Sequence, residues 1–435
     1  MTSPRALIAA AVAALIASAV GCGDGPLLPS NRCVAGWPGA AGEEGEAGPR
    51  FVPAPPLDGV EPGVLWTSRV TTAGVNDWLL LNGDRVAFAA GGSLYLLDRD
   101  GNYLGRTSST GREGVTSAVV GRDGNFYMVG YSVYSVSPDG DLRWVTPLPD
   151  DDGRFPRARG RLVADPGGGL YFGADDGYLY AVEAADGRLR WRTRVSGDGE
   201  RPPAVMTGGG DAVVAIARDG GPKPQLYSTA TGEPIAHFDG PRGERFVAMF
   251  GRDLGIVTQR MEDRGGAYPW MHITVLDACA HERWRIDAQR PQWPALIGAD
   301  DRLYVTERDD VEGSATFTSV YDVDGARVAG PVATATPWGL GADGTLYAVA
   351  CDSSGYDGPS RLYAYDQDLN QQWMLPLGDA CPMVGPVIDD QGRLYLGWYR
   401  DRATEIIAIQ TRSPGLADTS WPTRRRDPRG TGWLQ

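Results

Sequence analysis

The amino-acid sequence predicts an all-β fold, an eight-bladed β-propeller of four-stranded antiparallel blades. A degenerate unit of about 44 residues recurs eight times, which is the length of one such blade. Apolar residues alternate at period two within the units, and Asp-Gly or Gly-Gly pairs stand where hairpins need positive φ. Long segments with the helical period of 3.6 are absent from the sequence.

The repeat is clearest in residues 124–148 (GNFYMVGYSVYSVSPDGDLRWVTPL) and 168–195 (GGLYFGADDGYLYAVEAADGRLRWRTRV). Each unit has two longer strands, an Asp-Gly turn and a final strand that often carries tryptophan. One position of the second strand anchors all eight units: Val86, Tyr127, Tyr171, Val214, Ile256, Tyr304, Tyr347 and Tyr395.

The two ends of the repeat region predict how the ring closes. The last unit has no Trp-bearing fourth strand before Pro414, whereas VLWTSRV (64–70) precedes the first unit and matches LRWRTRV (189–195). We expect this N-terminal strand to complete the last blade, which removes two open sheet edges and bounds the propeller at 63–412.

Tryptophans occupy equivalent places in the fourth strands of several units. An aromatic binding rim is one interpretation, but packing between neighbouring blades is favoured because large aromatic rings dominate such contacts. The residues are Trp66, Trp144, Trp191, Trp284 and Trp373.

The N-terminus resembles a bacterial lipoprotein signal. Residues 1–21 hold a basic start and an apolar run shorter than a bilayer span, which is typical of a removed signal peptide. Cys22 then follows a small-residue exit and is the predicted lipidation site, although Ala19 stands where leucine is usual. Cleavage after Ala19 and a soluble secreted protein is the alternative.

Residues 22–62 are rich in Gly, Pro and Ala, and they predict a flexible tether. Glycines recur at every third position from Gly36 to Gly48. Five triplets are few for a collagen-like trimer, so a plain spacer is favoured.

Four cysteines remain once Cys22 is set aside, and an oxidising compartment allows three pairings. Cys351 with Cys381 is favoured because the repeat alignment puts them in neighbouring blades. Cys33 would then join Cys279 and fix the N-terminal segment. Four buried free thiols are the open alternative.

The repeat pattern, as in LYFGADDGYLYAVEAADGRLRWRTRV, resembles the pyrroloquinoline-quinone-type repeat. Quinoprotein alcohol dehydrogenases and the outer-membrane β-barrel-assembly lipoprotein share that repeat. The resemblance covers 64–412, is strong in units two, three and seven, and implies a bacterial envelope protein, most simply at the outer membrane.

Catalysis is not predicted. The adjacent cysteine pair that the quinone-cofactor enzymes carry is missing, common catalytic motifs are absent, and the acidic clusters sit where hairpin turns need Asp. We therefore expect no cofactor and no metal site. The alternative is a quinone-dependent dehydrogenase-like enzyme, or a small-ligand binder, that uses the central channel.

The expected function is a monomeric interaction scaffold that binds an envelope protein and reaches the membrane through its lipid. A formal net charge of −14 argues against nucleic acid as partner. Long insertions on a rigid ring favour partner binding, so the candidate contacts are 262–270, with Tyr268 and Trp270, together with 309–316 and 352–360.

The C-terminal tail, 413–435, is the last candidate. Its arginines, Arg424, Arg425 and Arg426, would bind an acidic partner or form a strap on the acidic propeller. The strap is the favoured interpretation.

Overall fold

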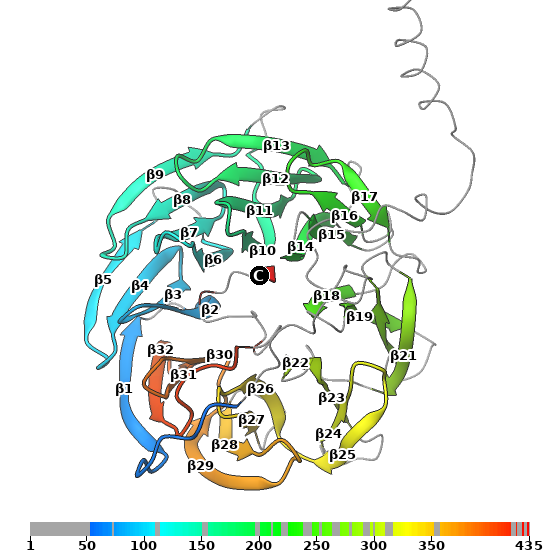
Figure 1. Cartoon of the computed structure of the whole chain (residues 1–435). Coiled ribbons are helices and arrows are strands. Elements are labelled where there is room, and N and C mark those ends of the chain that lie inside the picture. Colours follow the sequence, from blue (N-terminus) through cyan, green and yellow to red (C-terminus); the bar gives the residue numbers. More distant parts are fainter. Residues whose placement is uncertain are drawn as a thin grey trace, which may run out of the picture. The chain divides into compact units, whose positions relative to one another are not determined.

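The computed structural model confirms the all-β fold. Within the residues that it describes, every regular element is a β-strand, and the strands form eight sheets arranged in a ring (Figure 1). The described residues are 53–71, 74–108, 114–149, 155–195, 201–209, 212–218, 225–237, 246–251, 255–262, 270–277, 281–289, 296–298, 301–308, 316–351, 357–418, 423, 429 and 433–434.

Seven blades are consecutive four-stranded meanders with the first strand innermost (Figure 1). Blades one to three are β2 (Val75–Asn82), β3 (Arg85–Ala90), β4 (Ser93–Asp98), β5 (Tyr103–Ser108); β6 (Ser117–Val120), β7 (Phe126–Val129), β8 (Ser132–Val136), β9 (Leu142–Pro147); and β10 (Ala158–Ala164), β11 (Gly169–Ala174), β12 (Tyr178–Glu183), β13 (Leu189–Arg194). Blades four and five are β14 (Arg201–Gly209), β15 (Ala212–Arg218), β16 (Gln225–Ser228), β17 (Pro234–His237); and β18 (Phe246–Gly251), β19 (Gly255–Glu262), β20 (Trp270–Leu276), β21 (Glu282–Gln289). Blades six and seven are β22 (Leu296–Ile297), β23 (Leu303–Arg308), β24 (Thr316–Tyr321), β25 (Arg327–Ala333); and β26 (Thr336–Leu340), β27 (Leu346–Cys351), β28 (Asp357–Tyr365), β29 (Gln371–Ala380).

Blade eight is closed by the N-terminal strand, as the sequence predicts. β30 (Val384–Ile388), β31 (Arg393–Arg400) and β32 (Ala403–Gln410) are followed in space by β1 (Gly63–Thr71). β1 pairs antiparallel with β32 from one end to the other, and Trp66 lies opposite Ala408. β1 therefore covers the edge of β32 and gives blade eight the same four strands as the other blades.

The core consists of apolar layers between neighbouring blades rather than one central cluster. β11 is buried at all six positions, whereas β13 is only partly buried, because a middle strand is covered by blades on both faces. Leu162 and Phe172 of blade three, for example, pack with Tyr127 of blade two. Such layers join neighbouring blades even where the repeat pattern in the sequence is weak.

The part of the expected tether that the structure describes, 53–62, is held against the ring. The amide of Ala54 donates to the carbonyl of Ala342 at 2.8 Å, and that of Leu57 donates to Arg412 at 2.7 Å. Arg412 also bonds Glu61 at 3.1 Å. The rest of the tether and the signal segment, including Cys22, lie outside the described residues.

Candidate functional site

The repeated tryptophans pack between blades, which confirms the favoured interpretation. The indole nitrogens of Trp66, Trp191 and Trp284 each donate to a carbonyl in the third turn of the next blade, at 2.9, 2.8 and 2.8 Å. A Cβ on Gly101, whose φ is +83°, would lie 2.7 Å from the Trp66 ring. These indoles are therefore structural and do not form an exposed binding rim.

Aspartate–tyrosine pairs recur in the turn between the first and second strands. The hydroxyl of Tyr127 donates to Asp123 at 2.7 Å, that of Tyr171 to Asp165 at 2.5 Å, and that of Tyr395 to Asp389 at 2.9 Å. The same carboxylates accept turn amides, such as Asn125 to Asp123 at 3.1 Å. Each aspartate thus fixes a turn and satisfies a buried phenol.

The electrostatics of these pairs fit a structural role. Burial, followed by the neighbouring Asp123, raises the pKa of Tyr127 to about 12. Burial opposes ionisation of Asp123, but hydrogen bonds from Tyr127 and Asn125 outweigh it and lower the pKa of that carboxyl. The phenol stays protonated and the carboxylate stays charged at neutral pH, so neither is poised to exchange a proton there.

A pocket of about 340 Å³ lies between blades two and three. It is lined by 121–123, 164–170 and 184–185, which are turns of the two blades, and it includes Asp123 and Asp165. Arg190 lies 3.7 Å from Asp165, so this carboxylate is already compensated. Within the described part of the chain, no group of three His, Cys, Asp or Glu side chains is placed to hold a metal ion.

One histidine is buried beside an acid in blade five. Nδ1 of His272, on β20, lies 2.5 Å from Oδ1 of Asp287, the residue paired with it on β21. Arg285 approaches the same carboxylate at 3.5 Å. The three side chains form a cross-strand polar network on one blade, which stabilises the sheet.

The predicted insertions share one face of the ring. They connect second to third strands: β19 to β20, β23 to β24, and β27 to β28. We call this side the insertion face and the opposite side, which carries the first turn of each blade, the strap face. Tyr268 lies outside the described residues. Trp270 begins β20 and pairs through its backbone with Glu262 and Gln289, but its side chain is outside the description.

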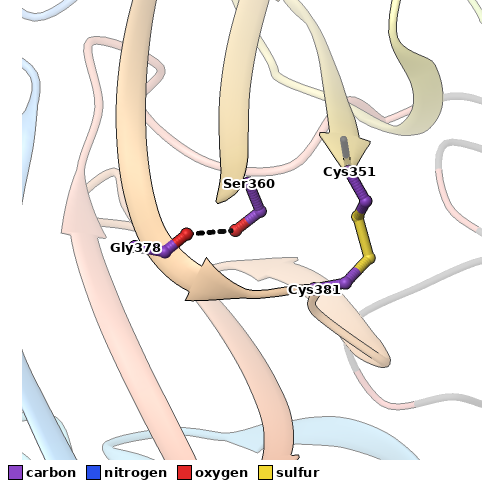
Figure 2. The surroundings of a disulfide bond; sticks show 4 residues. All are labelled: Cys351, Ser360, Gly378 and Cys381. Carbon is purple, nitrogen blue, oxygen red and sulfur yellow. Dashed lines mark hydrogen bonds between the residues drawn. A yellow bond between two sulfur atoms is a disulfide. The ribbon is translucent and has the colours of Figure 1, made fainter. Parts of the chain in front are cut away.

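Cys351 and Cys381 form a disulfide, with Cα atoms 5.6 Å apart (Figure 2). This is the pairing that the repeat alignment favours, but its location differs slightly from the expectation. Cys351 ends β27, and Cys381 directly follows β29 of the same blade, in the connection to blade eight. The bond therefore ties blade seven to the start of that connection, on the insertion face. Cys33 and Cys279 lie outside the described residues.

The C-terminal tail has a path that sequence reasoning did not predict. Its described residues contact the inner strands of blades seven and two: Leu416 bridges Gly341, Thr423 bridges Gly339, and the carbonyl of Arg429 accepts from the amide of Val120 at 2.9 Å. The last strand, β33 (Trp433–Leu434), pairs in parallel with β14 in the middle of the ring (Figure 1). Arg424, Arg425 and Arg426 themselves lie outside the described residues.

No described helix is long and apolar enough to cross a membrane.

Comparison with known proteins finds similarity to one family over part of the chain. Residues 129–235 match the family model described as outer membrane protein assembly factor BamB. The outer membrane protein assembly factor BamB of Salmonella typhimurium is 34% identical over 73 residues, which are 16% of this chain and 19% of that protein. Residues 129–235 therefore resemble the pyrroloquinoline-quinone-like repeats of BamB, as the sequence pattern predicts.

Solved structures share the fold at low identity. Sqt1 of Saccharomyces cerevisiae superposes with a TM-score of 0.57 at 11% identity, over 81% of this chain and 100% of that one. Quinohemoprotein alcohol dehydrogenase from Comamonas testosteroni gives 0.51 at 12% identity, over 83% and 77%. These similarities support the propeller and carry no activity across.

Proposed function

We propose that this protein is a non-catalytic, lipid-anchored scaffold of the bacterial envelope that docks another protein on its insertion face. One observation carries the proposal: the three insertions of blades five, six and seven emerge on the same side of a rigid ring. Loops that a rigid scaffold positions together are the usual place for binding residues.

The relationship to BamB supports the location and the class of function, not the identity of the partner. The matched residues, 129–235, run from blade two to blade four. The insertions at 262–270, 309–316 and 352–360 lie beyond that match. We infer that the shared part is the scaffold, whereas the contacts with the partner are particular to this chain.

The disulfide gives the insertion face a rigid point beside the third insertion. It joins the end of β27, where that insertion begins, to the connection after β29. Ser360 of β28 is the backbone partner of Cys351 on β27. Its hydroxyl donates a hydrogen bond to the carbonyl of Gly378 at 3.3 Å (Figure 2). Holding a loop's ends in this way reduces the entropy that it loses on binding.

Cross-linking in intact cells tests the docking face. A photoreactive residue at Tyr268 is expected to give a discrete cross-linked product that disappears when the 352–356 insertion is replaced by Asn-Gly. The matched control places the same residue at Tyr103, an exposed position on the outer strand β5 of blade one, and no product is expected there. Equal products from both positions would contradict the proposal.

The lipid anchor is tested separately through Cys22. A Cys22→Ala chain is expected to leave the membrane fraction and appear in the soluble extract, because stable attachment needs more than one acyl chain. Cleavage after Ala19 predicts instead that the wild-type and variant chains fractionate alike.

The quinone-dependent alternative makes a spectroscopic prediction. Titration of the purified protein with pyrroloquinoline quinone and calcium is expected to leave the quinone spectrum unchanged, since β33 is seated in the ring's middle. A saturable spectral change with tight uptake would favour the alternative.

A further inference from the structure

The middle of the ring is occupied by the chain's own C-terminus, and this occupation is built from backbone contacts. All described anchors lie where an inner strand approaches the first turn of its blade: Gly341 and Gly339 at the end of β26, Val120 at the end of β6, and 208–209 at the end of β14. Blades seven, two and four lie on different sides of the ring (Figure 1). The described residues of the tail therefore contact blades on different sides of the ring.

Glycine stands at the pairing positions on the inner strands. Leu416 and Thr423 lie opposite Gly341 and Gly339, and 433–434 lie opposite 208–209, both of which are glycine. A Cβ on Gly341 would come within 2.5 Å of the Ser413 hydroxyl. One on Gly339 would come within 2.8 Å of Pro386 Cγ and reach the Thr423 methyl at an ordinary contact distance of 3.5 Å. Glycine inside a strand weakens the strand and is typical of close approach by another backbone.

The anchoring is firm at one point and slight at the other. Thr423 is completely buried, whereas β33 has only two residues and adds one short parallel pairing to an edge of β14. Short parallel pairing is among the weaker forms of strand addition. The strands that residues 419–435 contact already belong to complete four-stranded blades, so this segment can leave and return without breaking a blade.

Charge complements the backbone contacts. The last seventeen residues, 419–435, contain four arginines and one aspartate, whereas the whole chain carries a formal net charge of −14. Residues 63–412, which form the ring, have a formal net charge of −13, opposite in sign to that of the segment. An extended basic segment is the chemistry that such a surface attracts.

We propose that the inner edge formed by the ends of β14, β6 and β26 is a docking surface for an extended basic peptide, and that residues 419–435 are its resident, releasable occupant. The tail then acts as a strap that blocks this surface in cis. A partner segment of the same chemistry binds only by displacing it. The proposal concerns the strap face and does not rest on the docking function of the insertion face.

A truncated chain tests the surface directly. A protein ending at Asp418 is expected to bind a fluorescent peptide of residues 419–435 saturably, with affinity that falls as salt rises. The full chain is expected to bind at least about tenfold more weakly, because its own strap competes at high effective concentration. Equal binding by both chains, or none by a folded truncated ring, would overturn the proposal.

The full-length chain carrying Trp433→Pro keeps the test decisive even if truncation prevents folding. Proline removes a backbone donor from β33, so amide exchange at 208–209 and at Val120 is expected to rise about tenfold while β12 is unchanged. Adding the wild-type peptide is expected to restore protection, whereas a peptide with the same Trp433→Pro change does not. Unchanged exchange in the variant, or no recovery with the wild-type peptide, would refute the strap.

Discussion

The two ends of the ring-forming chain are attached in different ways. At the N-terminal end, the nine residues of β1 pair along β32 and complete a blade. At the C-terminal end, the two residues of β33 add to the inner edge of a blade that already has four strands. The first attachment completes a four-stranded blade, and the second adds a short fifth strand to a blade that is already complete.

Packing explains why the difference matters. Trp66 and Val70 of β1 contact the apolar layer between blades eight and one, together with buried residues such as Tyr395. Trp66 and Arg393 also both donate to the carbonyl of Arg99, at 2.9 Å each, so blades eight and one share one acceptor. The closing strand thus supplies core as well as edge pairing, and its loss exposes both.

The largest expected difference in stability is between a chain that lacks the N-terminal end and one that lacks the C-terminal end. A chain that begins at Gly74 is expected to lose cooperative unfolding and to aggregate, because β32 becomes an open edge and the apolar layer around Ile406 and Ala408 loses Trp66 and Val70. A chain that ends at Asp418 is expected to stay folded. Size exclusion and thermal unfolding followed by circular dichroism compare the two, and equal unfolding midpoints would contradict the distinction.

The disulfide is expected to contribute less to the free energy of unfolding than the closing strand β1 does. Replacing Cys351 and Cys381 by serine opens a crosslink between residues 30 apart, which is expected to lower the free energy of unfolding by about 3 kcal/mol. Denaturant titration measures this loss. Wild-type protein in reductant serves as the control and is expected to match the double variant.

Two tryptophan variants separate closure from ordinary blade packing. Trp66→Ala and Trp191→Ala each remove an indole that docks on the next blade, and each is expected to cost roughly 3 kcal/mol. Only Trp66→Ala is expected to speed amide exchange throughout β1, because β13 is held in its blade by a direct chain connection. Faster exchange in β13 of Trp191→Ala, to the same degree, would remove the contrast.

Buried tyrosines lie near both chain ends, and alkaline pH tests their contribution to stability. This is the smallest effect that we expect, and it is absent near neutral pH. Burial raises the pKa of Tyr227 to about 12, and burial followed by Asp389 raises that of Tyr395 beside the closing strand. A folded pKa above the unfolded value gives stability that is complete below about pH 10 and is lost as pH rises through the folded pKa.

We therefore expect the unfolding midpoint to fall above about pH 10, together with a cooperative rise of phenolate absorbance. Tyr395→Phe removes one contributor and is expected to make that fall shallower. An unchanged pH profile in this variant would show that Tyr395 does not contribute.

The sequence by itself determined the strands, the blade count and the closing strand. Alternation at period two, turn glycines such as Gly101 and the Trp-bearing strand pattern are local signals, and the repeat presents them eight times. The sequence match between 64–70 and 189–195 then required β1 to fill the fourth place in blade eight. It also favoured the Cys351–Cys381 pairing from the position of each residue in the repeat.

Only the tertiary structure decided three features: where the described residues of the tail bind, how 53–62 is attached, and that the disulfide joins blade seven to the connection that leads into blade eight. The tail's anchors are backbone contacts, and a backbone edge leaves no pattern of side chains in the segment that binds it. The receiving glycines, Gly339 and Gly341, look like ordinary turn residues until the strands are assembled. Contacts of this kind depend on which edges the folded ring leaves open, and no local stretch of sequence contains that information.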